Sequence, residues 1–305
     1  MNLYVGFDIG GTSIKHLVVD QDLHILESNS FPTQSQLGAA GTIKTMVDVV
    51  HSYANAYRGT VKAVGVGCTG PVNIETGEIQ NPYTLPGFEG HSLSASMEPE
   101  LGVPVVVEND ANTAHVGEVA FSKRQIDNSM MITFGTGVGV SVRLGGSLFR
   151  IPGAIHPEIG HISVGVDSDE SCYCNKTRCF EHVMSGTAIN RYAYETFGRS
   201  PEAVLQDSES DEAQAFINRL VTASTDAIVT LSVIFQPEIV FISGGMHGFY
   251  CRHVMEPVQE RLDRLMPMYG KTTLVEAQMG PDAGCYGAAV IAVEHMGRLG
   301  DQHLV

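Results

Sequence analysis

The stretch that decides the fold stands near the N-terminus and reads Phe7-Asp8-Ile9-Gly10-Gly11-Thr12. The apolar run 3–7 precedes the two glycines, and residues 13–19 are again apolar and β-branched, which predicts a strand, a glycine turn and a second strand. Because Gly10 and Gly11 have no Cβ, their backbone N–H groups can approach phosphate oxygens closely. The stretch therefore predicts a phosphate loop in which Asp8 holds a metal ion through water. A plain two-residue hairpin turn is the alternative.

A second glycine turn repeats this layout in the middle of the chain. The buried run 130–134 leads into a turn that contains Gly135, Thr136 and Gly137, and residues 140–142 resume strand character. The glycines let this loop approach the same anion from another domain, with the Thr136 hydroxyl as a further donor. Two matched turns predict a duplicated α/β fold. A dinucleotide-binding loop would be followed by a helix, so a nicotinamide cofactor is disfavoured.

Composition narrows the class of partner. The 305 residues are 43% hydrophobic, which allows a large core and about two domains of ~150 residues. With 18 Lys and Arg against 34 Asp and Glu, the formal charge is −16, which works against binding nucleic acid or an anionic membrane. No secretory pattern or apolar run of ~18 residues is present. We therefore expect a cytoplasmic protein with a small-molecule partner.

Three cysteines crowd into eight residues. Cys172, Cys174 and Cys179 have spacings of two and five, and His161 lies eleven residues upstream of the first cysteine. This is the composition of a structural Cys₃His zinc site, and clustered thiols suit a reducing compartment better than a disulfide framework. Three reduced thiols and a polar histidine are the alternative. The metal would hold the surrounding loop in shape and would not contact phosphate.

Carboxylates at two places could carry the chemistry. Asp110 follows the predicted strand 103–107 at its C-terminal end, where it could take the proton from an attacking hydroxyl. The amide of Asn109 can both donate to and accept from hydroxyls of a bound molecule, although an Asn-Asp helix cap is the alternative for this pair. Glu158 and Glu181 flank the cysteine cluster and are candidate ligands for hydroxyl groups, because a carboxylate can accept from two neighbouring hydroxyls; surface carboxylates are the alternative.

With these segments the chain resembles, nearly end to end, the ROK family, the repressor, open-reading-frame and kinase group of the actin-like ATPase fold. The matching segments, in chain order, are residues 8–12, 67–72, 108–112, 135–139, 158–161 with the cysteine cluster, and 237–240 leading into Gly244-Gly245. The resemblance implies that Gly70 lies in a sugar-side turn and that Gly244 and Gly245 form the adenosine-side turn. It also implies that Asn109, Glu158 and Glu181 bind the sugar. His161 is implied to face the sugar through the ring nitrogen that does not bind zinc.

The resemblance further implies an α/β fold of two actin-like ATPase (ribonuclease H-like) domains with an interdomain cleft. We expect one domain over residues 1–117, completed by a C-terminal helix over 293–305, and a larger one with the zinc knuckle over 118–292. The implied activity is ATP-dependent phosphorylation of the 6-hydroxyl of a hexose, with Mg²⁺ beside ATP, a structural Zn²⁺ and a homodimeric assembly. Glucose is the first expectation, with mannose, fructose, N-acetylglucosamine and N-acetylmannosamine as alternatives.

Departures from the family pattern concern the knuckle and the sugar. Asn175 and Arg178 stand where relatives carry glycine, which predicts a reshaped but closed loop, because asparagine tolerates the left-handed region and arginine does so at some cost. Thr84 replaces an asparagine usual in relatives, and His156 is shared with some fructose- and mannose-directed relatives. The hexose is therefore the least determined feature.

Non-catalytic functions remain as alternatives to the kinase. A sugar-sensing transcriptional regulator is disfavoured, since the first phosphate loop begins at Asp8 and leaves no room for a DNA-binding domain of ~60–80 residues ahead of it. A sugar-binding protein without activity is disfavoured because Asp110 and both phosphate turns are present.

Overall fold

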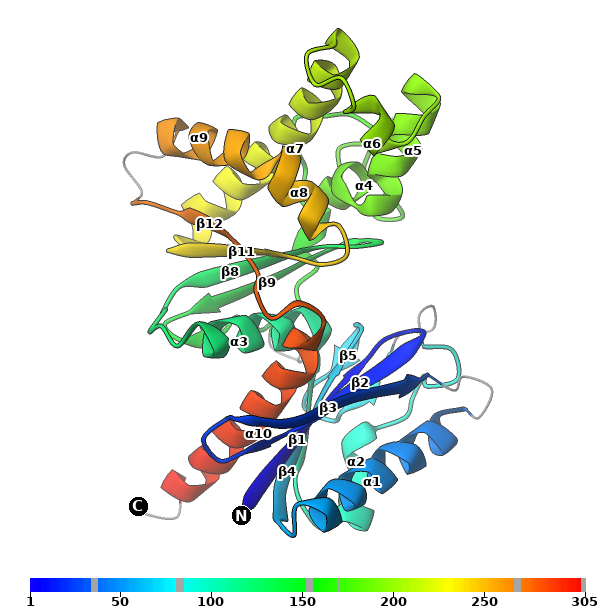
Figure 1. Ribbon diagram of the computed structural model, residues 1–305, viewed down its shortest axis with the longest axis vertical. Coiled ribbons are helices and arrows are strands. Elements are labelled where there is room, and N and C mark those ends of the chain that lie inside the picture. The colour runs from blue at the N-terminus through cyan, green and yellow to red at the C-terminus, as the bar shows by residue number, and fades with distance from the viewer. Residues whose placement is uncertain (34–37, 81–84, 152–155, 169, 266–269, 303–305) are drawn as a thin grey trace. The chain divides into compact units, whose positions relative to one another are not determined.

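The computed structural model describes residues 1–33, 38–80, 85–151, 156–168, 170–265 and 270–302 (Figure 1). Thr84, which bears on the expected sugar contacts, lies outside the described residues. The chain divides into two compact units: unit 1 comprises Met1–Arg124, Arg150–Pro157 and Met279–Val305, and unit 2 comprises Gln125–Phe149 and Glu158–Gln278.

Unit 1 is built on a five-stranded sheet with the order β3-β2-β1-β4-β7. Its strands are β1 (Asn2–Ile9), β2 (Ser13–Asp20), β3 (Ile25–Pro32), β4 (Thr60–Cys68) and β7 (Val105–Asn109). The first three strands are antiparallel neighbours, whereas β4 runs parallel to both β1 and β7. A two-stranded sheet pairs β5 (Val72–Asn73) with β6 (Glu78–Ile79). The strand, glycine turn, strand layout expected around Gly10 and Gly11 is therefore realised as β1 and β2.

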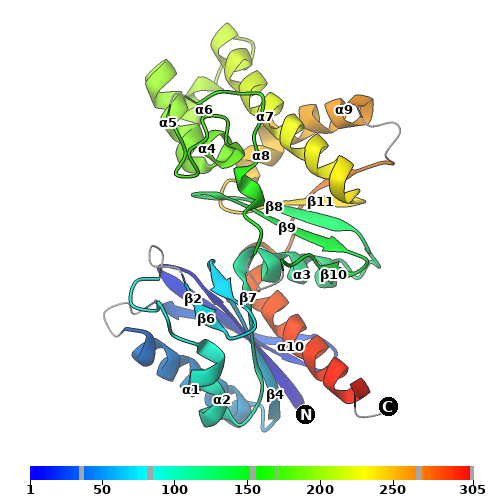
Figure 2. The same cartoon turned by 180° about the vertical axis from the view of Figure 1, so that it is seen from behind.

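Helices cover both faces of the unit 1 sheet (Figure 2). On one face lie α1 (Gly38–Ala56) and α2 (Leu93–Leu101), and on the other lie α3 (Asp110–Ser122) and α10 (Ala283–Gln302). The approach of α10 to the sheet requires glycine in β4: a Cβ added at Gly65 would lie 1.8 Å from the backbone oxygen of Ala288. The C-terminal helix therefore packs directly on β1, which ends at the first glycine turn, and on β4, which ends just before Thr69.

Unit 2 repeats the same topology with a sheet of order β10-β9-β8-β11-β12. Its strands are β8 (Ser129–Phe134), β9 (Val138–Leu144), β10 (Ser147–Leu148), β11 (Ile239–Ser243) and β12 (Thr273–Glu276). In both units three consecutive antiparallel strands are joined to two parallel strands, so that the strand order is 3-2-1-4-5 within each sheet. The predicted duplicated α/β fold is confirmed.

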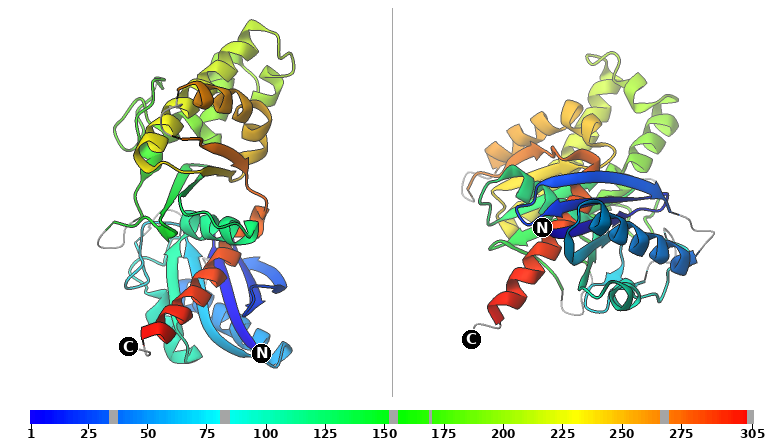
Figure 3. Two further views of the ribbon diagram at one scale, coloured as in Figure 1. Left: turned by 90° about the vertical axis from the view of Figure 1, so that its left-hand side faces the viewer. Right: turned by 60° about the horizontal axis from the view of Figure 1, so that its bottom comes forward.

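The helices of unit 2 gather on one side of its sheet (Figures 1 and 3). They are α4 (Phe180–Met184), α5 (Gly186–Phe197), α6 (Pro201–Val204), α7 (Asp211–Phe235), α8 (His247–His253) and α9 (Met255–Leu265). Among the described helices, α7 alone is long and apolar enough to cross a membrane by length and composition. Half of its apolar window is buried, and Phe216, Leu220 and Ile228 pack in the unit 2 core, so packing explains its hydrophobicity.

The sequence-based domain limits fall inside two helices. The limit at residue 117 lies within α3 and the limit at residue 292 lies within α10, and each of these helices belongs as a whole to unit 1. Unit 1 also includes the short segment Arg150–Pro157, whose neighbours on both sides in the sequence belong to unit 2.

Candidate functional site

The first glycine turn is held from behind while its tip is exposed. The Gly10 N–H donates to the Ser13 carbonyl at 3.0 Å, which closes the link between β1 and β2. Thr33, just after β3, donates its hydroxyl to the Gly10 carbonyl at 2.6 Å and its N–H to the Thr12 carbonyl at 2.9 Å. Gly11 and Thr12 are exposed. The turn therefore has the fixed backbone and open face that an anion-binding loop needs.

Asp8 lies at the end of β1, beside the first turn. Burial raises the pKa of its carboxyl to about 6, the negative charge of Asp110 adds to the shift, and Lys15 opposes it. The start of α10 reaches this carboxylate, because a Cβ added at Gly284 would lie 2.6 Å from the Asp8 Cγ. Two carboxylates that disfavour each other's ionised form are suited to share a cation.

Asp110 stands at the junction where β7 ends and α3 begins. The N-cap of α3 is Asn109, whose Oδ1 accepts from the N–H groups of Ala111 and Asn112 at 3.0 and 3.3 Å. The Asp110 side chain shares one of these donors and also reaches the turn after β4: Oδ1 accepts from the Ala111 N–H at 2.8 Å, and Oδ2 accepts from the Thr69 hydroxyl at 3.1 Å. Burial raises the pKa of Asp110 above the usual value for an aspartate. The carboxylate is thus oriented, hydrogen-bonded and more basic than a surface aspartate.

The turn after β4 lies against this junction. A Cβ added at Gly70 would come within 3.0 Å of the Asn109 Nδ2, and the Gly70-Pro71 peptide is cis. The structure therefore brings Gly70, Asn109 and Asp110 together, all of which were singled out from the sequence. Thr69 was missed as an Asp110 partner. Since the Asn109 oxygen is occupied by the α3 cap, its Nδ2 group is the part that faces the turn.

Glu108, one residue further back, makes a buried ion pair that sequence reasoning missed. Its side chain is 4% exposed, and its Oε2 accepts from the Nε and the terminal guanidinium nitrogen of Arg150 at 2.9 and 2.7 Å. Its Oε1 accepts from the Asn109 N–H and the Asn112 Nδ2, each at 2.9 Å. No local pattern could reveal this pair, because the partners are 42 residues apart in the chain.

The second glycine turn joins β8 to β9 in unit 2. The Gly135 N–H donates to the Gly137 carbonyl at 3.0 Å, and the Gly186 N–H at the start of α5 donates to the Gly135 carbonyl at 2.7 Å. The Thr187 hydroxyl donates to the Thr136 carbonyl at 3.3 Å, while Thr136 itself is exposed. The turn is therefore anchored by the N-terminal end of a helix.

The Gly244-Gly245 turn lies beside the end of β8. Gly244 has φ 93°, and a Cβ there would lie 2.4 Å from the Phe134 carbonyl oxygen, so this position requires glycine for both conformation and space. The Met246 N–H donates to the same carbonyl at 2.8 Å. Because β8 and β11 are parallel neighbours, the second glycine turn and the Gly244 turn share one edge of the sheet.

Glu181 links the second turn to the cysteine cluster. Its Oε2 accepts from the Val138 N–H at 2.9 Å, and a Cβ at Gly137 would lie 2.5 Å from the same oxygen. Its Oε1 lies 3.8 Å from His161 Nε2, which also contacts the Tyr173 hydroxyl at 2.6 Å. A cavity of about 140 Å³ opens here within unit 2, with lining residues that include Thr136, Tyr173, Glu181, Thr187 and Arg191.

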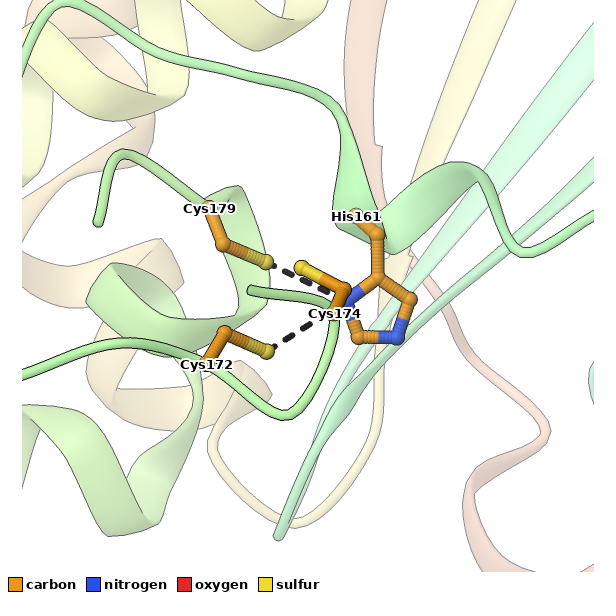
Figure 4. A group of neighbouring side chains, drawn as sticks. All are labelled: His161, Cys172, Cys174 and Cys179. Carbon is orange, nitrogen blue, oxygen red and sulfur yellow. Dashed lines mark hydrogen bonds between the residues drawn. The ribbon is translucent and has the colours of Figure 1, made fainter. Parts of the chain in front are cut away.

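The four predicted metal ligands converge in unit 2 (Figure 4). The Nδ1 of His161 lies 3.2 Å from the Cys179 Sγ and 3.6 Å from the Cys172 Sγ, and all four ligand atoms, with that of Cys174, lie within 4.8 Å of one another. A tetrahedral zinc site with ordinary bond lengths has ligand separations of about 3.5–3.8 Å. The donor set and its spacing therefore fit Zn²⁺, with Nδ1 toward the metal and Nε2 left to face Glu181.

The loop that carries the cysteines is closed despite its two departures from glycine. Asn175 adopts φ 64°, the left-handed conformation that asparagine tolerates. Arg178 does not adopt a positive φ, so it avoids the cost of that conformation. Arg178 instead donates to both carboxylate oxygens of Asp167, at 2.6 and 2.9 Å, and Lys176 Nζ donates to the His161 carbonyl at 2.9 Å. These side-chain bonds add to backbone bonds within the loop, such as that from the Asn175 N–H to the Cys172 carbonyl at 2.7 Å, and together they close it.

Glu158 and His156, the remaining residues singled out from the sequence, precede His161 and the cysteine loop in the chain. Glu158 is exposed and immediately precedes the 3-10 turn Ile159–His161 in unit 2. His156 is partly buried and belongs to unit 1.

Comparison with known proteins gives one consistent family. The model of the ROK family matches residues 4–295. Glucokinase of Streptomyces coelicolor is 29% identical, over 96% of this chain and 98% of its own, and N-acetyl-D-glucosamine kinase of Aliivibrio salmonicida is 23% identical, over 96% and 100%.

Solved structures agree with this match. The ROK hexokinase from Thermus thermophilus superposes with a TM-score of 0.84 at 25% identity, over 97% of this chain and 99% of its own. The ROK family glucokinase from Streptomyces griseus, solved in complex with glucose and AMPPNP, superposes with a TM-score of 0.73 at 28% identity, over 96% and 99%.

Proposed function

Because this chain belongs to the ROK family, we propose that it is a sugar kinase that transfers the γ-phosphoryl group of ATP to the 6-hydroxyl of a hexose, with glucose as the preferred substrate. The observation that carries the proposal is the setting of Asp110, a carboxylate with a raised pKa at the carboxyl end of β7, held by Thr69 and Ala111. A glucose-bound and nucleotide-analogue-bound relative at 28% identity supports the choice of substrates.

In this proposal Asp110 accepts the proton of the sugar hydroxyl as its oxygen attacks the γ-phosphorus. Asn109 offers its Nδ2 group to the sugar, since its oxygen caps α3. A raised pKa makes Asp110 a better proton acceptor, provided that it is ionised at the working pH. The positive end of α3 favours that ionised form.

The two glycine turns bind the phosphate chain of ATP. Gly10, Gly11 and Thr12 supply backbone and hydroxyl donors from unit 1, and the turn that contains Gly135, Thr136 and Gly137 supplies donors from unit 2. Gly244 and Gly245 approach the adenosine. Mg²⁺ accompanies ATP and neutralises phosphate charge, and Asp8 is the residue that would hold it.

The sugar is bound by Glu158, His161 and Glu181, with Gly70 in the turn that meets Asn109. Three acceptor-rich side chains around the 2-position favour a free hydroxyl there, whereas an acetamido group offers one N–H and needs an apolar niche for its methyl. Glucose and mannose are therefore expected to be better substrates than N-acetylated hexosamines. The N-acetyl-D-glucosamine kinases among the relatives keep that sugar as the second candidate.

His161, Cys172, Cys174 and Cys179 would bind a structural Zn²⁺ beside the proposed sugar ligands. Bound there, the metal would fix the loop that carries Glu181 and would leave the His161 Nε2 facing that carboxylate.

We propose a cytoplasmic location, which suits reduced thiols that bind zinc, and a homodimeric assembly. Light scattering on the purified protein tests the dimer, since the expected mass is about twice the 32.8 kDa of one chain.

A coupled ADP-release assay tests the function. Glucose, mannose, fructose, N-acetylglucosamine and N-acetylmannosamine should be compared by kcat/KM, with product analysis to identify the phosphorylated hydroxyl. Turnover on none of these sugars would contradict the kinase proposal, whereas an N-acetylated best substrate would overturn only the choice of glucose.

A further inference from the structure

Glu108 is a buried carboxylate whose oxygens are both fully engaged. Its side chain is 4% exposed, and such a group is costly to bury unless it is paired and hydrogen-bonded. Arg150 makes two donor bonds to Oε2, at 2.9 and 2.7 Å. Oε1 accepts from the Asn109 N–H and the Asn112 Nδ2 at 2.9 Å each. Four bonds to an ionised acceptor form a strong and directional set.

The bonds to Oε1 act directly on the residues that carry the chemistry. Asn109 caps α3 and Asp110 is the first residue of that helix. Asn112 lies in the first turn of α3, and its backbone N–H is bound by the Asn109 oxygen. Glu108 therefore holds the strand-to-helix junction at both its backbone and its first turn, and any rotation of the Glu108 carboxylate would move the point from which Asp110 projects.

Arg150 fixes the orientation of that carboxylate. It is the first residue of the segment 150–157, which is part of unit 1. The chain before this segment, up to Phe149, and the chain after it, from Glu158, belong to unit 2. Its side chain is 36% exposed, whereas that of Glu108 is buried, so the guanidinium closes the solvent side of the pair. Without Arg150, the carboxylate would be buried with half of its hydrogen bonds missing.

We propose that Arg150 is a positioning residue for phosphoryl transfer: acting through Glu108, it holds Asn109 and Asp110 in the geometry that the attack requires. The inference rests on the proposed role of Asp110 as the base. Displacements of about 1 Å near reacting groups can cost on the order of 10²-fold in rate. A residue that supports the base through a single intermediate side chain is therefore expected to affect kcat.

The test compares R150M, R150K and the double variant R150M/E108Q with the wild-type enzyme. R150M is expected to lower kcat by about 10- to 100-fold while the KM for the hexose changes by less than about threefold. R150K should be intermediate, because lysine restores the charge without the two-donor geometry. In the double variant, E108Q keeps a side-chain oxygen for Asn109 and Asn112 and removes the unpaired charge, so kcat should recover at least about fivefold over R150M.

A matched control removes an arginine from an exposed ion pair. Arg199 pairs with Glu212 on the surface of unit 2, with side chains 45% and 53% exposed, and R199M should keep kcat within about twofold of wild type. A kcat for folded R150M above half that of wild type, or no recovery in the double variant, would overturn the proposal. If R150M does not fold, R150K decides the question: its kcat should lie below half that of wild type with a nearly unchanged KM for the hexose, and a wild-type kcat in folded R150K would overturn the proposal.

Amide hydrogen exchange tests whether Arg150 holds the start of α3 in place, independently of the proposed enzyme activity. Faster exchange at residues 109–112 in R150M, with unchanged exchange in β1, is the expected result, and it does not depend on any substrate. Exchange at residues 109–112 equal to that of wild type would overturn the positioning role. Absence of sugar phosphorylation by the wild-type enzyme, in contrast, would contradict the proposed function, while faster exchange in R150M would still show that Arg150 holds residues 109–112 in place.

Discussion

The two glycine turns occupy matching places in two sheets of the same topology, yet they are held in different ways. The first turn, after β1, is fastened by the backbone and hydroxyl of Thr33, and carboxylates with raised pKa values lie beside it. The second turn, after β8, is fastened by the Glu181 carboxylate and by the start of α5. In unit 1 the acidic groups lie beside the turn, whereas in unit 2 an acidic group supports the loop itself. The difference supports the proposal that proton transfer belongs to unit 1 and that a structural metal helps unit 2 to hold its ligands.

Removing the base should have the largest effect. Asp110→Asn keeps the size of the side chain and an oxygen that can accept from Thr69, but it cannot take up the proton. We expect kcat to fall by about 10²–10⁴-fold, with hexose affinity measured by calorimetry changed only a few-fold. Turnover above about a tenth of wild type would refute the role of Asp110 and, with it, the assignment of the chemistry to unit 1.

Breaking the cysteine cluster tests the support of the second turn. Cys174→Ser removes one of four proposed zinc ligands, so zinc content should fall from about one ion per chain and the thermal midpoint should drop. Cys251→Ser is the control, since Cys251 is a thiol on α8 outside the cluster. Elemental analysis that finds no zinc in wild-type protein prepared without chelators would exclude the site.

Two substitutions at Glu181 separate its contacts. Glu181→Gln keeps an oxygen that can accept from the Val138 N–H but removes the charge, so the KM for the hexose should rise about tenfold while the KM for ATP stays within about threefold. Glu181→Ala also releases the turn, so the KM for ATP should rise as well. Equal KM values for ATP in the two variants would show that the bond to Val138 does not support nucleotide binding.

Asp8 is expected to make stability depend on pH, an effect that needs neither sugar nor nucleotide. Its pKa in the folded protein is about 6, above the usual 3.8, so the folded state binds the proton more tightly than the unfolded chain. The stability contributed by the protonated carboxyl is present at low pH and is lost as the pH rises through about 6. Without Mg²⁺, Asp8→Asn should therefore be more stable than wild type by about 3 kcal/mol at pH 8, and by much less near pH 4.

Chemical denaturation at both pH values measures this difference. Asp48→Asn on α1 is the control, because the Asp48 side chain is 63% exposed, and it should show no such pH-dependent gain. A gain for Asp8→Asn that is the same at pH 4 and pH 8 would contradict the raised pKa as its cause.

Features encoded by neighbouring residues were predictable from the sequence. Both glycine turns follow from apolar runs interrupted by glycine, and the candidate metal site follows from three cysteines within eight residues. The strand before Asp110 and the cap at Asn109 are likewise local, because a cap needs only a side-chain oxygen two or three residues from the N–H groups that it accepts. In each case, interactions over a few residues determine the structure.

Features made by distant residues were decided only by the tertiary structure. The sequence by itself determined a duplicated α/β chain and indicated a candidate base and a set of candidate metal ligands. Only folding brought Gly284 against Asp8 and Arg150 onto Glu108, and only folding seated the Glu181 carboxylate on the second turn, 43 residues away in the chain. The physical reason is that burial and charge pairing depend on which groups surround a side chain in space, so the raised pKa of Asp8 and the satisfied charge of Glu108 have no signature in the residues next to them.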